Sequence, residues 1–375
     1  MNIAVNTRTL VPDRLEGIGW FAFESLRRIV KAHPEHTFHF IFDRNYDERF
    51  LFAENVKPVL TFPPCRHHPW FWYAYFEYAI PYVLRKIKPD LFLSPDGWMT
   101  LRSDVPQVTV IHDINFAHHP EFFSTSFQKY FTNYFPKFVE KAVRVATVSE
   151  YSRQDICKTY GIAEDKIDVV YNGSNELFRP LTELEKSRVQ IQYAQGKDYF
   201  LFVSAINKRK NLPNILRAFD RFKEQTGSDV KFLVVGGRAG KLEELDEVLA
   251  TMKHVQDVFF LGHLPAKELA MVTGAAIALV YASFFEGFGI PIVEAYNAET
   301  AVITSNVTSM PEVAGDAAVL VDPHSVEQIA DGMTKLASDQ FFRNSLIEKG
   351  RVQRQKFSWD LTSQRLWACI EKAMK

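Results

Sequence analysis

The sequence has little cysteine, no excess of charge of either sign and no long apolar run. Its 375 residues include three cysteines, Cys65, Cys157 and Cys369, without the spacing of a metal site. This odd count, with a strand-like amino terminus in place of a signal peptide, predicts a reducing cytoplasmic location. The 44 Lys and Arg residues balance 45 Asp and Glu, which argues against a nucleic-acid-binding protein.

No stretch reaches the roughly 20 apolar residues that a membrane-spanning helix needs. The nearest candidate, residues 67–89, is rich in aromatic side chains but contains Glu77 and Pro81 and ends in a basic cluster. Two interpretations stay open for it. It is either an amphipathic helix packed on a core, or a surface that contacts lipid or a lipid-linked acceptor. The second would add peripheral contact with the inner face of the cell membrane.

Short apolar runs alternate with helical patterns along the whole chain. Such continuous runs, joined by helices, are typical of parallel sheets covered on both faces. Because 375 residues exceed one ordinary core, the pattern predicts two doubly wound α/β domains. The expected strands are residues 2–6, 37–42, 90–94, 107–112, 144–149 and 166–171 in the first half, and 199–204, 230–236, 258–261, 276–281, 301–305 and 317–321 in the second.

Turn-forming residues at 171–175 mark the expected domain boundary. The first domain then covers residues 1–175 and the second covers residues 176–355. Residues 356–375 form a separate last segment, a helix capped near Ser358. Two such domains are expected to face a central cleft, with ligands beyond the carboxyl ends of the strands.

The stretch FFEGFGIPIVEAYN, residues 284–297, follows one of these strands. Pro291 suits the first position of a helix, where its missing N–H costs nothing. The N–H groups near residues 288–292 would then point out of the helix start and form an anion site. Gly287 and Gly289 would let a ligand approach the backbone closely.

Two carboxylates, Glu286 and Glu294, flank this turn. A bound phosphate would repel them, whereas ligand hydroxyls are good donors to a carboxylate. An anion between two hydroxyl-rich groups describes a sugar, a diphosphate and a ribose, with Glu286 at the sugar and Glu294 at the ribose. The alternative for Glu294 is an acid placed in a first helical turn by the helix dipole.

A second loop, residues 204–211, contains three cations where another strand meets a helix. Such a charge run is often only a solvated face. At this sheet edge, however, Arg209 and Lys210 are candidates to bind the diphosphate. The chain has no Asp-x-Asp, the usual carboxylate pair at a metal-bound nucleotide. We therefore expect no metal and no cofactor.

The first domain offers weaker signals. Gly17 and Gly19 open a helix and could bring a second stretch of backbone to the ligand, or form only a tight turn. His112 lies at the carboxyl end of a strand next to Asp113, a better place for a functional histidine than most.

Taken together, these motifs resemble the retaining glycosyltransferases of family four, which have the two-domain GT-B fold. The resemblance covers nearly the whole chain, and Glu286-x7-Glu294 is its most specific part. The other matching pieces are Gly17-Ile18-Gly19, Ile111-His112-Asp113, Asn172-Gly173, Arg209-Lys210-Asn211, Ser309–Gly315 and Phe357-Ser358-Trp359.

The resemblance implies a role for each candidate residue. Glu286 and the amides of Phe288 and Gly289 would hold the donor sugar and phosphate, and Ile290 would belong to the same donor-binding turn. Glu294 would bind the ribose, Arg209 and Lys210 the diphosphate, and His112 would lie beside the reacting sugar. The last helix would cross back to the first domain. Many relatives have Gly-Arg at the position of Ser204-Ala205, so Arg209 is expected to replace that arginine.

The implied reaction is attack of an acceptor hydroxyl on the same face as the leaving diphosphate, with retention of configuration. The loop at Arg209 and residues 112–123 resemble bacterial polysaccharide mannosyltransferases, which favours GDP-mannose as the donor over a UDP-hexose. The acceptor would be a growing glycan or a lipid-linked glycan. A sugar-nucleotide epimerase and a non-catalytic nucleotide-sugar-binding subunit stay open as alternatives. A dehydrogenase is disfavoured, because position 22 is alanine and the Gly-rich turn lies well past the first strand.

Overall fold

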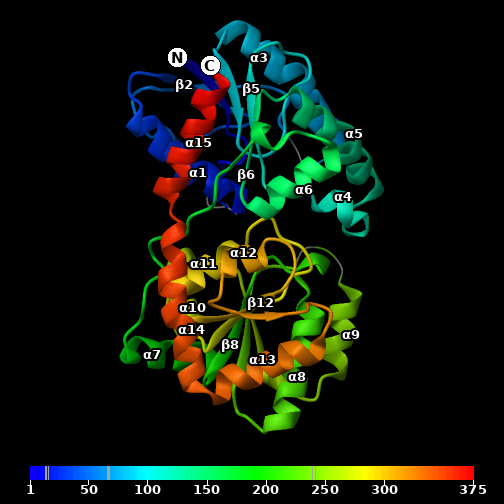
Figure 1. The fold of residues 1–375 in the computed structure, drawn as a ribbon, viewed down its shortest axis with the longest axis vertical. Coiled ribbons are helices and arrows are strands. Elements are labelled where there is room, and N and C mark those ends of the chain that lie inside the picture. Colours follow the sequence, from blue (N-terminus) through cyan, green and yellow to red (C-terminus); the bar gives the residue numbers. More distant parts are fainter. Residues whose placement is uncertain (13–14, 16, 66–67, 239, 241) are drawn as a thin grey trace. The chain divides into compact units, whose positions relative to one another are not determined.

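The computed structural model describes residues 1–12, 15, 17–65, 68–238, 240 and 242–375. The chain forms two compact units (Figure 1). Unit 1 comprises residues 1–173 and 358–375, and unit 2 comprises residues 174–357. Both boundaries differ by two residues from the expected ones. The reason is that Ser174 accepts a hydrogen bond from Asn297 and that the ring of Phe357 packs on Phe288, and both partners lie in unit 2.

Unit 1 contains a sheet of seven parallel strands in the order β3-β2-β1-β4-β5-β6-β7. Six of the seven lie where the apolar runs predict them. The strands are β1 (Asn2–Asn6), β2 (Thr37–Phe42), β3 (Val56–Leu60), β4 (Leu91–Ser94), β5 (Gln107–Ile111), β6 (Arg144–Thr147) and β7 (Ile167–Val169).

Strand β3 was not expected from the sequence. It is an edge strand that pairs only with β2, and it contains Pro58. An edge strand tolerates proline because one row of its N–H groups faces away from the sheet. Only Val56 of this strand is buried, and Lys57, Pro58 and Leu60 are exposed, so its pattern differs from that of the buried strands.

The helices of unit 1 include α1 (Gly17–Ala32), α4 (Asn115–His118), α5 (Thr125–Lys141) and α6 (Glu150–Tyr160). The aromatic stretch forms α2 (Pro69–Ala74), a π-helical segment (Tyr75–Ala79) and α3 (Ile80–Ile87) in succession; residue 67 lies outside the described residues. Pro81 cannot donate to the preceding turn, and a wider π turn lets the helix continue past it. The segment packs on a core through buried side chains that include Trp72, Phe76, Ile80 and Leu84.

Helix α15 (Trp359–Ala373) belongs to unit 1 and packs beside α1, as Figure 1 shows (red beside blue). Leu366, Trp367 and Ile370 are buried on its inner face, as their spacing predicts. The approach of the chain to this helix requires glycine at position 173. A Cβ atom there would lie 2.3 Å from the backbone nitrogen of Trp359.

Unit 2 contains six parallel strands in the order β10-β9-β8-β11-β12-β13. The strands are β8 (Tyr199–Val203), β9 (Lys231–Val235), β10 (Val258–Gly262), β11 (Ala278–Tyr281), β12 (Ala301–Ser305) and β13 (Val319–Val321). Its helices are α7 (Glu183–Ala194), α8 (Leu212–Thr226), α9 (Glu243–Thr251), α10 (Ala266–Gly274), α11 (Ile290–Asn297), α12 (Met310–Ala314), α13 (Val326–Ser338) and α14 (Gln340–Gln353).

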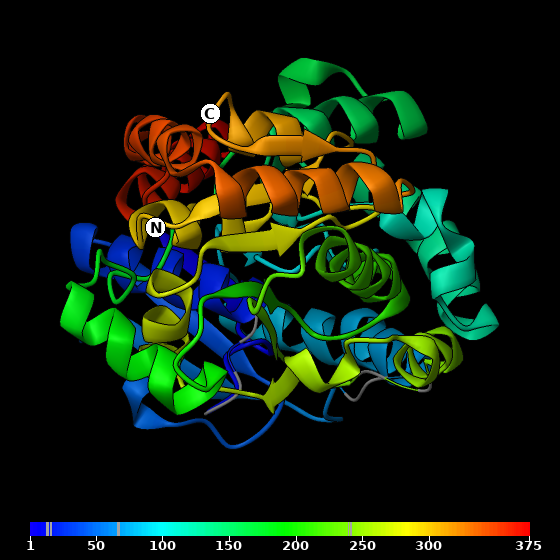
Figure 2. The ribbon, with the colours of Figure 1, turned by 90° about the horizontal axis from the view of Figure 1, so that it is seen from below.

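Helices cover both faces of this second sheet. Helices α8 and α13 pack together against Phe202 and Ile303, and α13 lies along the strands in Figure 2. Helix α11 packs on β11 and β12, whose alternate residues Leu279 and Val302 are also fully buried. Alternate residues of a strand point to opposite faces, so this sheet is doubly wound as expected.

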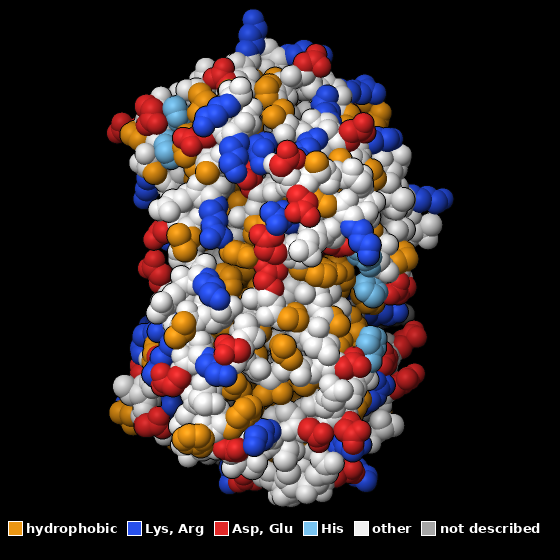
Figure 3. All heavy atoms as spheres, viewed as in Figure 1, with side chains coloured by type: hydrophobic (Ala, Val, Ile, Leu, Met, Phe, Trp, Pro, Cys, Tyr) orange, Lys and Arg blue, Asp and Glu red, His pale blue; other side chains and the backbone are white. Residues whose placement is uncertain are grey.

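The surface carries mixed charge. Basic and acidic side chains are interspersed over the face drawn in Figure 3. Among the residues that the structure describes, no helix is both long enough and apolar enough to cross a membrane.

Candidate functional site

Two loops of unit 2 meet because their strands are neighbours. Strands β8 and β11 are parallel and paired, so both end at the same edge of the sheet. The β8 loop leads to a 3₁₀ turn at Lys208–Lys210, and the β11 loop leads to α11. The amide of Phe284 donates to the carbonyl of Arg209 at 2.9 Å, and Asn211 donates to the carbonyl of Ala282 at 2.8 Å. Two of the predicted loops are thus joined by one backbone hydrogen bond and one from the Asn211 side chain.

The carboxylate of Glu286 lies between Arg209 and Lys210. A terminal nitrogen of Arg209 donates to Oε2 at 2.8 Å, while Lys210 and the hydroxyl of Tyr281 both donate to Oε1, the latter at 3.0 Å. Lys210 also donates to the Tyr281 hydroxyl at 2.8 Å. Glu286 and Lys210 are only 6% and 7% exposed. The sequence-predicted sugar ligand and the two predicted diphosphate ligands therefore form one buried cluster.

The electrostatics of this cluster keep Glu286 ionised. Burial alone would raise its pKa, but Arg209 and Lys210 outweigh burial and lower the pKa to about 2. Burial raises the pKa of Tyr281 well above its usual range, so its hydroxyl stays protonated. Two cations and one carboxylate leave the cluster with a net charge of about +1. Such a cluster suits a bound anion.

The turn before α11 differs in part from the expected anion site. Pro291 is the second residue of the helix, not the first, and the amide of Ile292 donates to the carbonyl of Gly289 at 3.0 Å. Residues 291 and 292 therefore provide no N–H for an anion. The amides of Gly289 and Ile290 have no acceptor among the described residues. Within the predicted stretch 288–292, the amides that remain for a ligand are therefore those before Pro291.

Gly289 is needed for the local backbone. Its φ of +104° is one that side-chain-bearing residues rarely adopt. A Cβ atom there would also lie 3.1 Å from Ile292 and 3.3 Å from Met310. These contacts give a packing reason for this glycine besides ligand approach.

The ring of the neighbouring residue Phe288 is buried in the core, and its backbone carbonyl is held by a hydrogen bond. Its ring is 3% exposed and stands edge-on to Phe357, with ring centres 5.4 Å apart. The hydroxyl of Ser309 lies 3.1 Å from the Phe288 carbonyl and 2.9 Å from the Glu286 carbonyl. Ser309, at the start of α12, thus holds the turn in one conformation.

Glu294 lies one turn into α11 in an environment unlike that of Glu286. Its carboxylate has no hydrogen-bond partner among the described residues, and its side chain is partly buried. Burial raises its pKa to about 8. An acceptor held without a protein partner is suited to bind ligand hydroxyls.

In unit 1, His112 follows β5 and is held by two contacts. Its Nε2 atom lies 2.9 Å from the carbonyl oxygen of Pro95, and Phe21 of α1 stands edge-on to the ring at 4.9 Å. Burial lowers its pKa, which favours a neutral ring with the proton on Nε2. Asp113 accepts from the amide of Asn115, the first residue of α4, at 3.1 Å.

Gly17 and Gly19 open α1 but differ in their surroundings. A Cβ at Gly17 would meet no atom within 4 Å, whereas one at Gly19 would lie 3.0 Å from the carbonyl oxygen of Thr9. Gly19 is therefore explained by packing within unit 1. Glu16, which precedes this turn, lies outside the described residues.

Tyr281, Asn211 and Ser309 were not assigned roles from the sequence. In the sequence, Tyr281 is only the last residue of an apolar run. Its position beside Lys210 depends on the pairing of β11 with β8. Asn211 adopts φ +59° and donates to the carbonyls of Ala282 and Pro323, at 2.8 and 2.7 Å. Asparagine tolerates this left-handed conformation better than most residues, so its residue type is the one sequence feature that could have indicated a special backbone conformation at position 211.

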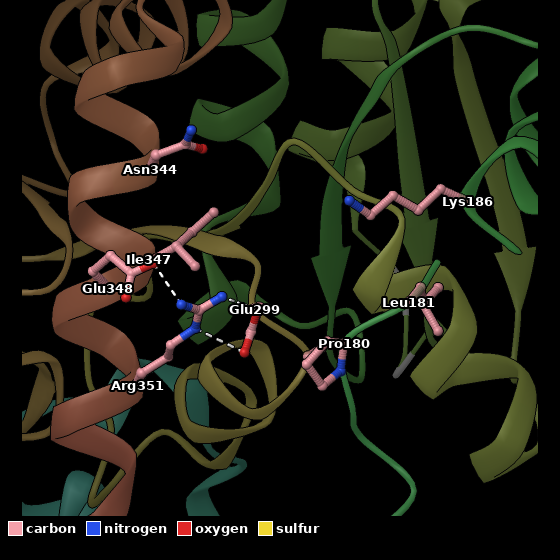
Figure 4. Close-up of a pocket in the computed structure, with 9 residues that line it drawn as sticks. Pro180, Leu181, Lys186, Glu299, Asn344, Ile347, Glu348 and Arg351 are labelled. Carbon is pink, nitrogen blue, oxygen red and sulfur yellow. Dashed lines mark hydrogen bonds and ion pairs between the residues drawn. The ribbon is translucent and has the colours of Figure 1, made fainter. Parts of the chain in front are cut away.

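A pocket of about 280 Å³ lies elsewhere in unit 2. Figure 4 shows Arg351 of α14 pointing at Glu299, with Lys186 and Pro180 on the far side. Arg351 donates to both oxygens of Glu299, at 2.8 and 2.6 Å. None of the predicted donor ligands lines this pocket.

Comparison with known proteins identifies both units. The family described as "Glycosyltransferase Family 4" matches residues 15–176, and the family "Glycosyl transferases group 1" matches residues 184–353. The O-antigen chain mannosyltransferase B of Escherichia coli is 26% identical, over 92% of this chain and 93% of its own. The O-antigen chain mannosyltransferase RfbU of Salmonella typhimurium is 29% identical, over 78% and 81%.

Solved structures agree in fold. The Anabaena protein Alr3699/HepE, crystallised with UDP and glucose, superposes with a TM-score of 0.77 over 98% of this chain and 99% of its own, at 16% identity. The GT-B fold expected from the sequence is confirmed. The chain belongs to the glycosyltransferases, with a family 4 domain followed by a group 1 domain.

Proposed function

We propose that the protein transfers a hexose, with mannose favoured, from a nucleotide-diphosphate sugar to a glycan or lipid-linked glycan during cell-surface polysaccharide synthesis. The observation that carries this proposal is the buried cluster of Glu286, Arg209 and Lys210 beside the start of α11. The two mannosyltransferases similar to this chain over most of its length support the sugar and the process.

In this proposal the cluster binds the sugar and the leaving diphosphate together. Arginine has five N–H donors and lysine three, so Arg209 and Lys210 can each bind Glu286 and a phosphate oxygen at once. The amides of Phe288, Gly289 and Ile290 add N–H donors with the favourable dipole of a helix start. Glu294 accepts hydrogen bonds from the ribose hydroxyls.

The proposed chemistry proceeds with retention of configuration. The acceptor hydroxyl attacks the anomeric carbon on the face from which the diphosphate leaves, and a phosphate oxygen takes its proton. The two cations stabilise the negative charge that develops on the leaving group, which is the charge that a metal ion would otherwise neutralise. His112, neutral and fixed by its contact with Pro95, is our candidate in unit 1 for a contact with the reacting sugar.

A ligand panel tests the donor site and identifies the nucleotide. Thermal stability is measured with GDP, UDP, ADP and their hexose conjugates, with and without EDTA. Ligand at about 100 times its dissociation constant stabilises the fold by about 2.7 kcal/mol. We expect GDP and GDP-mannose to stabilise the protein, and EDTA to leave the shift unchanged. A shift with the UDP series alone would reassign the donor to a UDP-hexose.

Single substitutions test whether the ligand-induced shift in thermal stability arises from binding at this site. Lys210→Ala and Glu294→Ala should each abolish most of it. Lys208→Ala is the matched control, because Lys208 lies in the same turn but its side chain is exposed and has no partner among the described residues. If no nucleotide shifts the wild type, the transferase proposal fails. If nucleotide binds but no acceptor is ever glycosylated, an epimerase or a non-catalytic binding subunit replaces it.

We further propose that unit 1 contacts the inner face of the cell membrane through the aromatic stretch. Trp70, Tyr78 and Tyr82 are 63%, 52% and 63% exposed. Tyr78 and Tyr82 are four residues apart, and the exposed Arg85 and Lys86 continue the same face. Exposed aromatic side chains beside basic ones suit the headgroup region of an anionic bilayer.

Vesicle sedimentation tests this contact. The protein should sediment with vesicles containing about 30% anionic lipid and not with purely zwitterionic ones, since attraction to anionic headgroups is part of the binding. The double variant Trp70→Ser, Tyr82→Ser should remain in the supernatant. Phe341→Ser, which removes an 87% exposed ring from unit 2, serves as the control. Equal sedimentation of all three proteins would refute the assignment.

A further inference from the structure

A group of potential metal ligands lies at the end of unit 1 remote from His112. His33, Glu35 and His36 occupy the connection between α1 and β2. Because all seven strands are parallel, this connection lies at the amino edge of the sheet, whereas His112 lies at the carboxyl edge. Among the residues that the structure describes, it is the one group of three such side chains whose ligand atoms lie within 4.8 Å of one another.

The distances between these atoms suit a small divalent cation. Nδ1 of His33 is 3.5 Å from a carboxylate oxygen of Glu35, and Nε2 of His36 is 3.3 Å from the same oxygen. With metal–ligand bonds of about 2.0–2.1 Å, neighbouring ligands of a tetrahedral ion lie ~3.3–3.4 Å apart. Two of the three edges therefore already have the required length, and the ligand atoms on the third edge lie within 4.8 Å of each other.

The surrounding residues hold both imidazoles and the turn. The ring of His33 stacks on Trp367 of α15 at 3.7 Å, and His36 stacks on the same indole at 5.2 Å. The side-chain amide of Asn55 lies 3.0–3.1 Å from the carbonyls of Val30, His33 and His36. Nδ1 of His36 is 3.1 Å from the Met1 nitrogen, and Nε2 faces Glu35. An ion at Nε2 requires the ring proton to lie on Nδ1, where the Met1 amino group accepts it after releasing its own proton to solvent. These contacts reduce the conformational entropy that binding an ion would cost.

We propose that His33, Glu35 and His36 form a binding site for a divalent transition-metal ion, with Zn²⁺ the best-suited biological ion. Two imidazoles and one carboxylate are a ligand set that Zn²⁺ accepts, and water completes the tetrahedron. Glu35 is well exposed, so the ion can enter from solvent. The site links the α1–β2 turn to α15 through Trp367 and is independent of donor binding by unit 2.

Calorimetric titration with Zn²⁺ of chelator-treated protein, prepared without a histidine tag, tests the proposal. We expect one Zn²⁺ per chain, bound at a micromolar dissociation constant. Each of His33→Asn and His36→Asn should weaken binding by about tenfold or more, and the double variant should abolish it. His119→Asn is the matched control, because His119 pairs with Glu121 at 2.9 Å but has no second imidazole in its group.

The wild-type protein provides two further readouts. Ni²⁺ or Co²⁺ should quench the fluorescence of Trp367, and Trp367→Phe should remove that part of the quenching while Zn²⁺ still binds. X-ray absorption of the zinc-loaded protein should show two imidazole ligands. The proposal is overturned if the wild type binds no Zn²⁺ at concentrations up to about 1 mM. It is also overturned if the double variant binds as well as wild type, or if His119→Asn loses binding equally.

Discussion

Arg209 donates to Glu286 at 2.8 Å, although the two residues come from different loops, 77 positions apart in the chain. The cation that the sequence assigns to a diphosphate is thus already paired with the carboxylate assigned to the sugar. Lys210 joins the same carboxylate from the adjacent position. The proposed donor site is therefore a single electrostatic cluster, and its parts should respond together to mutation.

Lys210 and Glu286 should show strong energetic coupling. Glu286→Gln leaves the two cations without their carboxylate and should lower the free energy of unfolding by about 2–4 kcal/mol. Lys210→Met removes one of the two cations that stabilise the buried carboxylate and should also lower it, while Arg209 still pairs with Glu286. The double variant should lose less than the sum, with a coupling energy of at least about 1 kcal/mol. Urea unfolding of the four proteins measures this, and additive losses would contradict a shared cluster.

The same carboxylate predicts a pH dependence. The pKa of Glu286 is lowered from its usual 4.5 to about 2, so its contribution to stability is present above pH 4.5 and is lost as the pH falls toward 2. Wild type should therefore lose its stability advantage over Glu286→Gln in that window. A constant difference between pH 6 and pH 3 would disagree with the ion cluster.

Glu294 should have the opposite effect on stability. Its pKa is raised from 4.5 to about 8, so the folded protein resists its ionisation. As the pH rises from 4.5 to 8, wild type should become less stable relative to Glu294→Gln, by about 1–3 kcal/mol at pH 8 and above. Thermal unfolding across this range tests the sign. Parallel curves for the two proteins would mean that Glu294 is fully solvated.

Gly173→Ala should destabilise unit 1. The new Cβ would lie 2.3 Å from the Trp359 nitrogen, so either residue 173 or the start of α15 must move. We expect a loss of about 2–4 kcal/mol and earlier proteolysis at α15. Gly237→Ala, where a Cβ meets nothing within 4 Å, should be close to neutral. Equal melting temperatures for the two variants would contradict the close packing of Gly173 against Trp359.

His112→Gln should separate stability from transfer. Burial lowers the pKa of His112, so its contribution to stability is present above pH 6.5 and lost as the pH falls further. Glutamine can keep a donor for the Pro95 carbonyl and should flatten this acid dependence. Transfer should fall by about tenfold or more while donor binding is retained, as expected for a group acting at the reacting sugar. The exposed His263→Gln is the control. Unchanged transfer by His112→Gln would remove His112 from the site.

Most of the fold could be predicted from local pattern, because buried parallel strands are continuous apolar runs. Thr37–Phe42 and Ala301–Ser305 have the bounds that their sequences predict. Strand β3 could not be recognised, because it contains Pro58 and Lys57, which are suited only to an edge strand. Its place at the edge follows from its pairing with β2, which the sequence does not show. The π-helical turn before Pro81 likewise depends on the helix continuing on both sides.

The site was predictable in its residue types but less so in its contacts. The two glutamates and the cations follow strands, so their gathering at one sheet edge could be argued from topology. The pairing of Glu286 with Arg209 and Lys210 depends on side-chain geometry between two loops. His33 and Trp367 are in contact although they lie 334 positions apart in the sequence. No local sequence pattern predicts such a contact.

The measurement that tests the central claim most directly is proton NMR of the transfer reaction, with the donor identified by the panel and a fragment of the cell-surface glycan as acceptor. Wild type should release one nucleoside diphosphate for each new glycosidic bond, and an α-linked donor should give an α-linked product. Lys208→Ala should behave as wild type, and Lys210→Ala should give almost no product. A β-linked product, or nucleotide release without a new bond, would contradict the proposed retaining transfer.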